Sequence, residues 1–338
     1  MTLYCGIDLH SNNVLISIIN ENDQLVSEKR LTNSLPLILT HLSPYQTELS
    51  GVVVESTYNW YWLVDGLMEA GYPVLLANTV AIQQYQGIKH TNDASDARYL
   101  AHLLRLGILP TGYIYPQPLR FVRDLLRRRL LLVQQRTAQL LSLQTLLARH
   151  TGQHLPVAKI KQLTVSTMPE LLTQTWVCYC AQQMMCTILQ LGKQITEIET
   201  VVEKQCQQYP QYELIISTPG IGRILGMTIL LETGDIKRFM YPSHYASYAR
   251  CVPSDKISNG KSKGQNNRKN GNRYLAMAFV EAAHYAAIWD DTIKRHYQRK
   301  CKTAPLMVAK KAIANKLARA CYHMLKNNEG FDVNKAFR

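Results

Sequence analysis

A stretch of about thirty residues without glycine or proline, starting near residue 119, restricts most strongly how this chain can fold. Its apolar residues recur at helical spacing, so it predicts one long amphipathic helix. A second helical stretch covers about 168–207, and Gly152 and Pro156 lie in the connection between the two. Two such helices are typical of an antiparallel coiled-coil arm, which we expect over residues 113–208.

The residues before this arm alternate between strand-like and helix-like runs. The predicted elements are strands at 3–8, 13–19 and 24–31, a helix at 34–43, a strand at 51–56, a helix at 58–70 and a strand at 73–77. Short polar turns make the first three strands antiparallel, and the later alternation predicts parallel strands with crossover helices. We therefore expect an α/β domain over residues 1–112, with the element order of an RNase H-type fold.

The C-terminal part, residues 209–338, predicts a helical domain. Pro-Gly-Ile-Gly at 219–222 lies between apolar segments and resembles the hairpin of a helix-hairpin-helix element, or else a plain helix-capping turn. The most polar stretch of the chain follows at 254–273, and residues 272–326 predict two or three further helices. The eight cysteines lack the spacing of a zinc site, so we expect them to be reduced and mostly buried.

The charge distribution indicates the class of partner. The chain carries a net charge of +14, with −5 over residues 1–112, +6 over 113–208 and +13 over 209–338. A basic excess of this kind predicts a polyanion partner, and nucleic acid is the default; the alternative is a soluble basic protein with solvated charged faces. No apolar run is long enough to span a membrane, and Asp8 follows too closely for a secretory signal, so we expect a cytoplasmic protein, associated with the nucleoid when bound to DNA.

Four acidic residues stand where strands end and a helix begins. Asp8 closes the first strand and Glu55 the fourth, so both carboxylates should emerge at one edge of the sheet. Asp93 and Asp96 share one face at a predicted helix start. Clustered carboxylates repel one another unless cations neutralise them, and oxygen ligands select Mg²⁺ or Mn²⁺. Taken singly, each residue could instead be a helix cap, a turn former or a surface charge.

Basic side chains and the hairpin glycines are the candidates for nucleic-acid contacts. For the arginines of the first arm helix, a ridge that tracks phosphates and an ordinary solvated face are equally compatible with the sequence. The residues that we assign to nucleic-acid binding are Arg120, Arg123, Arg127, Gly220, Gly222, Lys261, Lys263, Arg268, Lys269 and Arg273.

Several blocks of the sequence, in order and at similar separation, resemble one family. They are GIDLH (6–10), VVVES (52–56), KHTNDASDARYLA (89–101), TPGIGRILGMTILLETGDIKRF (218–239), VPSDKISNGK (252–261) and KNGNRYL (269–275). Together they resemble the DEDD-type insertion-sequence transposases of the IS110 group, which includes Piv-like DNA invertases. The resemblance implies a RuvC-like N-terminal domain, a coiled-coil arm and a C-terminal transposase domain.

The resemblance also implies roles for individual residues. The family's acidic tetrad corresponds to Asp8, Glu55, Asp93 and Asp96, and its serine nucleophile to Ser258. Asn259 follows this serine where the family usually has glycine, and asparagine tolerates the left-handed backbone conformation that glycine would supply. A different alignment places Asn259 itself at the serine position, which leaves Ser262 and Ser254 as alternatives. Asn267 and Arg268 depart from the isoleucine-serine that usually precedes the Lys/Arg-Gly pair.

The implied reaction is DNA strand transfer through a covalent phosphoserine, with Mg²⁺ at the tetrad of one subunit and the serine of another. A structured bridge RNA and a dimer or tetramer are further implied partners. The alternatives are a DNA invertase, a junction-resolving nuclease that uses the carboxylates alone, and a non-enzymatic nucleic-acid-binding protein. More distantly, GIDLHSNN (6–13) is similar to a phosphate loop of actin-like ATPases.

Overall fold

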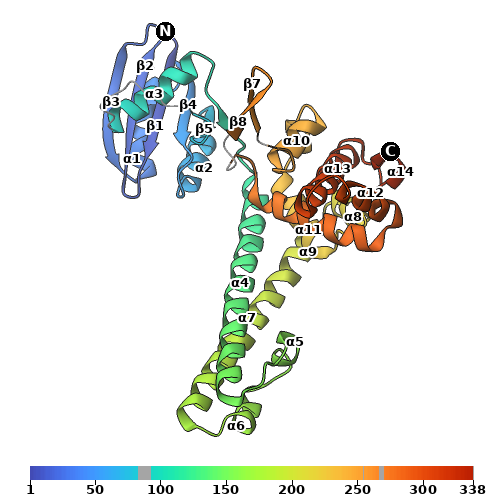
Figure 1. Ribbon diagram of the computed structural model, residues 1–338. Coiled ribbons are helices and arrows are strands. Elements are labelled where there is room, and N and C mark those ends of the chain that lie inside the picture. The colour runs from blue at the N-terminus through green and yellow to red at the C-terminus, as the bar shows by residue number, and fades with distance from the viewer. Residues whose placement is uncertain (83–92, 254, 266–269, 338) are drawn as a thin grey trace. The chain divides into compact units, whose positions relative to one another are not determined.

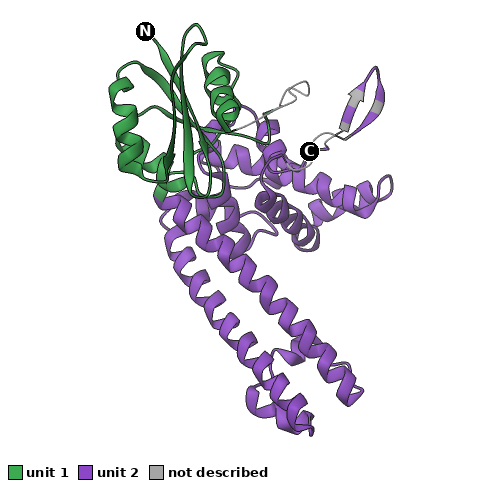
Figure 2. Cartoon of the chain, turned by 90° about the vertical axis from the view of Figure 1, so that its left-hand side faces the viewer, with its two compact units in different colours: residues 1–117 green, residues 118–338 purple. Residues whose placement is uncertain are grey.

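The computed structural model describes residues 1–82, 93–253, 255–265 and 270–337. Within it the chain forms two compact units, residues 1–117 and residues 118–338 (Figure 2). All eight cysteines are free, and five of them are buried, as the sequence predicts. Residues 118–338 form one unit, so the further division into an arm and a C-terminal domain stays a prediction.

The first unit contains a six-stranded mixed sheet in the order β3-β2-β1-β4-β5-β6. The strands are β1 (Leu3–Leu9), β2 (Asn13–Asn20), β3 (Leu25–Thr32), β4 (Leu49–Glu55), β5 (Val74–Ala77) and β6 (Thr111–Gly112). The first three are antiparallel, and β1, β4 and β5 are parallel, as predicted. The sequence analysis missed β6, because a strand of two residues has no periodicity to recognise.

Helices cover both faces of this sheet. Helices α1 (Leu35–Leu42) and α2 (Tyr61–Glu69) pack on one face, where Ile7 of β1 is fully buried. Helix α3 (Asp93–Arg105) packs against β1 and β2 on the other face, which also carries Gly6. A Cβ atom on Gly6 would collide with the backbone of Ala97 in α3. The glycine therefore permits the close approach of this helix to the central strand.

Two long antiparallel helices begin the second unit: α4 (Gln117–Thr151) and α7 (Thr175–Cys206) (Figure 1). They pack through apolar side chains such as Leu143 on α4 and Met185 on α7. Their far end is closed by α5 (Val157–Ile160), a 3-10 helix at Val165–Thr167 and α6 (Met168–Leu171). The predicted helical segment at about 168–207 starts at Met168 as expected, but it is interrupted because the backbone becomes extended at Leu172, and α7 starts only at Thr175.

Further helices and one hairpin complete the second unit. They are α8 (Pro210–Ile216), α9 (Arg223–Thr233), a 3-10 helix at Ile236–Arg238, α10 (Pro242–Tyr248), β7 (Asp255–Ser258), β8 (Lys261–Gln265), α11 (Arg273–Trp289), α12 (Asp291–Cys301), α13 (Leu306–Asn327) and α14 (Val333–Ala336). The prediction of two or three helices over 272–326 is confirmed by α11, α12 and α13. The polar stretch contains a two-stranded hairpin that the sequence analysis did not predict.

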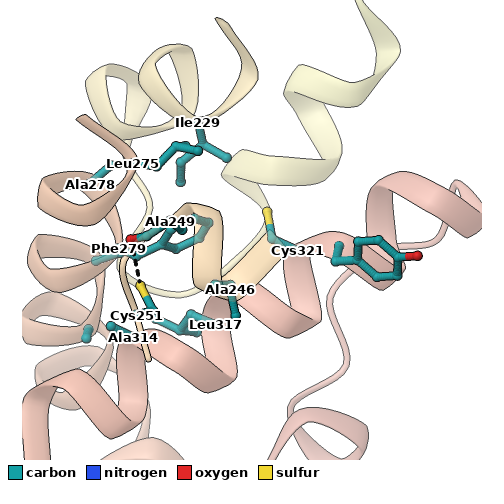
Figure 3. Close-up of a cluster of buried hydrophobic side chains, with 14 of the residues drawn as sticks. Ile229, Ala246, Ala249, Cys251, Leu275, Ala278, Phe279, Ala314, Leu317 and Cys321 are labelled. Atoms are coloured by element: carbon teal, nitrogen blue, oxygen red, sulfur yellow. Dashed lines mark hydrogen bonds between the residues drawn. The ribbon is translucent and has the colours of Figure 1, made fainter. Parts of the chain in front are cut away.

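The core of these C-terminal helices lies between α10, α11 and α13. Figure 3 shows Phe279 of α11 beside Ala246 of α10 and Leu317 of α13. Alanines along α11, including Ala278, are fully buried and let the neighbouring helices approach closely. None of the helices in the described residues combines the length and the apolar character needed to cross a membrane.

Candidate active site

Three elements of the first unit bring the four predicted carboxylates together at one sheet edge. Asp8 near the end of β1 is buried, and Glu55 ends the parallel neighbour β4. Side chains alternate along a strand, so Asp8 lies on the same sheet face as Gly6 and Glu55 on the same face as Val53. That face is the one covered by α3, whose first turn contains Asp93 and Asp96.

The electrostatics of the site reflect this crowding. Burial, a hydrogen bond with Asp8 and the charges of Asp8 and Asp96 raise the pKa of Glu55 to about 7. Burial, Asp8 and Asp93 likewise raise the pKa of Asp96 above its usual range. Carboxylates that raise one another's pKa values are poorly compensated by cations of the protein itself. This part of the site is therefore suited to an added cation.

Asp93 has cationic partners in the chain. The Nη2 atom of Arg30 donates a hydrogen bond to Oδ2 of Asp93 at 2.6 Å. This bond, with smaller effects of His10, lowers the pKa of Asp93 below its usual range. The Nε2 atom of His10 lies 3.2 Å from Oδ2 of Asp8 and 3.3 Å from Oδ2 of Asp93. Neither Arg30 nor His10 was predicted as a site residue.

The strand register explains how Arg30 reaches the site. Asp8 pairs with Leu15 on β2, and Leu15 pairs with Arg30 on β3. Residues opposite one another on neighbouring strands share a face, so Arg30 lies on the Asp8 face two strands away. The sequence indicates that side chains alternate along each strand, but it does not show which residues pair between strands. Arg30 was therefore not predicted as a site residue. For His10 a signal was present, because it follows Asp8 by two residues in GIDLH.

Ion pairs hold α3 against the antiparallel strands. Arg98 of α3 donates to Glu28 of β3 at 2.9 Å. Nearer the end of the helix, His102 and Arg105 both contact Asp23 in the turn between β2 and β3. These contacts, together with the close approach at Gly6, determine where the first turn of α3 lies. They therefore position Asp93 and Asp96 without touching either.

The donor atoms at this edge fit a divalent cation. Ligand atoms of Asp8, His10 and Asp93 all lie within 4.8 Å of one another. The Nε2 atom of His10 is buried and makes no hydrogen bond among the described residues, although two carboxylate oxygens lie near it. A buried nitrogen placed in this way between carboxylates is an arrangement that a bound cation would complete.

Ser258, the predicted nucleophile, lies in the second unit. It is exposed at the end of β7 and pairs with Lys261 across the hairpin. Asn259 and Gly260 form the turn with φ angles of 50° and 69°, the left-handed values of a type I′ turn. Asn259 thus adopts the left-handed conformation that asparagine tolerates. Lys256 and Lys263 are exposed on the same two strands, where the pairing register shifts between Asp255 and Ile257.

The remaining candidates around this hairpin are only partly described. Ser262 pairs with Ile257 in the register of the hairpin. Ser254, Arg268 and Lys269 lie outside the described residues. Arg273 begins α11, is exposed, and its Nη2 atom lies 2.8 Å from the hydroxyl of Tyr274.

The three arginines assigned to the first arm helix make contacts within the protein. Arg120 and Arg123 are buried, so they form neither the expected ridge nor a solvated face. Arg127 pairs with Glu232 of α9. Periodicity predicted the helix correctly, but it could not show which tertiary partners the basic residues would meet. The assignment of these three arginines to phosphate binding therefore finds no support in their surroundings.

The two glycines of the Pro-Gly-Ile-Gly turn at 219–222 differ in their surroundings. Residues 217–222 connect α8 to α9, and Gly222 is the N-cap of α9. Gly220 has a φ angle of +83°, and a Cβ atom there would collide with the backbone of α11 at Ala286. Gly222 has open space where its Cβ would lie. Packing thus accounts for the glycine at 220, whereas the backbone at 222 is accessible to a ligand.

Comparisons with known proteins agree on one family. A family model described as a DEDD transposase of the IS110 type matches residues 5–151. A second, described as the transposase IS116/IS110/IS902 family, matches residues 212–298. The two matched regions contain, respectively, the four carboxylates and the hairpin that carries Ser258.

Individual relatives are distant. A putative transposase for IS117 from Streptomyces coelicolor is 26% identical over 42% of this chain and 34% of its own length. An uncharacterised 43.6 kDa protein of insertion element IS110 from the same organism is 28% identical over 30% of this chain and 25% of its own. A probable family 20 transposase from Pseudomonas aeruginosa is 24% identical over 78% of this chain and 80% of its own. The matches thus span about a third or less of the two Streptomyces proteins.

Proposed function

Because the chain belongs to the IS110 family of DEDD-type transposases, we propose that it cuts and rejoins DNA strands as a transposase. The observation that carries the proposal is the convergence of Asp8, Glu55, Asp93 and Asp96 at one sheet edge. The sheet order, with three antiparallel strands followed by two parallel ones, supports an RNase H-type, RuvC-like fold for the first unit. The antiparallel pair α4 and α7 supports a coiled-coil arm.

The four carboxylates would hold Mg²⁺, with Mn²⁺ as the alternative, because hard divalent ions prefer oxygen ligands. When bound, such ions neutralise charge on a phosphodiester and assist the attacking and leaving oxygens. Asp8 is the central ligand, since it is buried and interacts with Glu55, His10 and Asp96. The raised pKa values of Glu55 and Asp96 support the need for such a cation.

Ser258 is the proposed nucleophile. Its Oγ attacks the phosphorus of a DNA phosphodiester, forming an Oγ–P bond, while the bond from phosphorus to one deoxyribose oxygen breaks. The serine loses its proton, and the leaving oxygen gains one to become a hydroxyl. A hydroxyl of the receiving strand then attacks the same phosphorus and restores serine. The bond energy is kept throughout, so no nucleotide cofactor is consumed.

The hairpin supports this role. Lys261 pairs with Ser258 across the hairpin, and Lys256 and Lys263 are exposed on the same two strands, so a phosphate bound there would meet cationic groups near the hydroxyl. The type I′ turn connects β7 and β8 through only two residues and so fixes the two strands relative to one another. The serine and the tetrad lie in different units, and we propose that the tetrad of one subunit and the serine of another complete the site within a dimer or tetramer.

DNA and a structured bridge RNA are the proposed partners. The concentration of basic charge over residues 209–338, at a net +13, supports binding to polyanions, and it is compatible with an RNA as well as DNA. In this proposal the RNA selects sites by base pairing, and the protein contacts backbones. Omission of the RNA should therefore abolish site choice while leaving salt-sensitive DNA binding.

The test is to trap a covalent intermediate. Full-length protein is incubated with DNA that carries the insertion element, the RNA transcribed from it and Mg²⁺, and is then denatured. We expect a protein–DNA adduct that is lost in Ser258→Ala and retained in Ser262→Ala. Asp8→Asn should lose both the adduct and strand exchange while keeping its fold. An adduct that survives Ser258→Ala and disappears with Ser262→Ala would overturn the assignment of the nucleophile. DNA cutting by Ser258→Ala at the wild-type rate would indicate the carboxylate-only nuclease instead.

A further inference from the structure

His10 stands among the predicted metal ligands although no step of the proposed reaction uses it. Its Nε2 atom is buried, while the side chain as a whole is 36% exposed. The atom lies 3.2 Å from Asp8 and 3.3 Å from Asp93, and forms no hydrogen bond within the described residues. The imidazole nitrogen thus lies within ion-pair distance of both carboxylates while making no well-directed hydrogen bond to either.

The site divides into two parts around Asp8. On one side, Asp8 shares a hydrogen bond with Glu55, and Asp96 contributes a further carboxylate. On the other side lie His10 and Asp93, whose ligand atoms and that of Asp8 fall within 4.8 Å of one another. The first part offers oxygen donors alone, whereas the second offers one nitrogen and two carboxylates. Arg30 bonds to one oxygen of Asp93 and leaves that carboxylate a second oxygen.

The two donor sets prefer different cations. Mg²⁺ favours oxygen ligands and water, and it rarely accepts imidazole. Divalent transition-metal ions accept an imidazole nitrogen together with carboxylates and gain affinity from it. We propose that His10 is a metal ligand, and that with Asp8 and Asp93 it forms a subsite for a divalent transition-metal ion such as Mn²⁺ in preference to Mg²⁺. The inference rests on the proposed function, since it presupposes that Asp8 holds a metal.

The experiment detects the nitrogen ligand directly. Full-length protein is loaded with Mn²⁺, and pulsed electron paramagnetic resonance records the coupling between the ion and nearby nitrogen nuclei. We expect a nitrogen-14 signal that changes to the nitrogen-15 pattern when histidine is isotopically labelled. His10→Asn should lose the signal, and His41→Asn, which alters a histidine on α1, should retain it. The labelled wild-type protein tests the ligand even if His10→Asn fails to fold.

A titration then tests metal preference. Mn²⁺ affinity should fall about tenfold in His10→Asn, while Mg²⁺ affinity, measured by competition, should change less than about twofold. Mn²⁺ that binds, depends on Asp8 and shows no histidine coupling would overturn this inference and leave the metal site of the proposed function intact. Binding that does not depend on Asp8, or no binding, would overturn both.

Discussion

Arg127 of α4 and Glu232 of α9 form a two-point ion pair, in which Nε donates to Oε1 at 2.6 Å and Nη2 to Oε2 at 2.7 Å. Glu232 is only 2% exposed, and Asn272 also donates to its Oε2 at 2.7 Å. Asn272 in turn accepts bonds from the first backbone amides of α11. One carboxylate thus connects the base of a long arm helix with two helices of the C-terminal part.

Removal of Arg127 should destabilise the protein markedly. Arg127→Met removes the two-point cationic partner of the buried Glu232 carboxylate, which typically costs about 3 kcal/mol. Arg127→Met combined with Glu232→Gln should recover part of the loss, because the buried carboxylate charge is gone. Urea unfolding of the single and double variants measures both effects. Arg223→Met is the control, since this arginine is 63% exposed beside Glu203 and should cost less than about 1 kcal/mol. Equal losses in the two single variants would contradict the prediction.

The metal-free protein should lose stability as pH rises. The pKa of Glu55 is about 7 in the folded chain against an ordinary value of 4.5, mainly because of burial and then because of Asp8. The folded state therefore binds this proton more tightly than the unfolded state. Its contribution is fully present below about pH 4.5 and is lost as pH rises through about 7. Because the side chain is only half-buried, we expect a loss of about 1 kcal/mol after solvent screening.

Urea unfolding without metal at about pH 5 and about pH 8 measures this loss. Glu55→Gln should remove this component of the pH dependence, while Glu69→Gln, at an exposed position on α2, should retain it. An unchanged slope in Glu55→Gln would show that other groups cause it.

The two glycines of the 219–222 hairpin should respond differently to alanine. Gly220→Ala places a Cβ against the backbone of α11 and strains a residue with a φ of +83°, so we expect a loss of several kcal/mol, about 3 or more. Gly222→Ala meets open space at a φ of −85° and should cost less than about 1 kcal/mol. Thermal unfolding of both variants checks the contrast. Similar stability of the two would mean that the hairpin does not pack on α11 as described.

The lysines beside Ser258 should contribute to DNA affinity through phosphates. Lys261→Gln with Lys263→Gln should weaken binding similarly for all DNA sequences and reduce the slope of log affinity against log salt by about 2. Fluorescence anisotropy over a series of salt concentrations gives the slope. Lys193→Gln is the control, since it removes an exposed lysine on the arm helix α7. A slope unchanged in the double variant would place the phosphate contacts elsewhere.

Much of the candidate site followed from local patterns. Strand periodicity and the positions of Asp8 and Glu55 at strand ends were enough to predict one sheet edge, because parallel strands end together. The helix start at Asp93 and Asp96 was also readable from the sequence. These patterns do not show which residues of neighbouring strands lie opposite one another. The position of Arg30, two strands from Asp8 on the same sheet face, could therefore not be inferred.

Tertiary contacts account for the other differences. Arg120 and Arg123 were expected on a phosphate-tracking ridge or a solvated face of the first arm helix, whereas packing buries both. The hairpin at 255–265 was readable in principle, since Asn-Gly is a strong signal for a type I′ turn, but the surrounding strands are too polar to show alternation. The proposed metal preference rests on where the Nε2 atom of His10 lies, and the position of His10 two residues after Asp8 was a sequence signal for it that was not used.

Because Gly6 has no side chain, α3 can lie close enough to β1 for the four acidic groups to come together. Since α3 rests directly on the backbone at this position, a methyl group there would wedge the helix off the sheet. Asp93 and Asp96 would move with the helix, and Asp8 and Glu55 would stay behind on their strands. Such a change would separate the two pairs of carboxylates, so under the proposed function it should inactivate the protein at a residue that is not itself a proposed ligand.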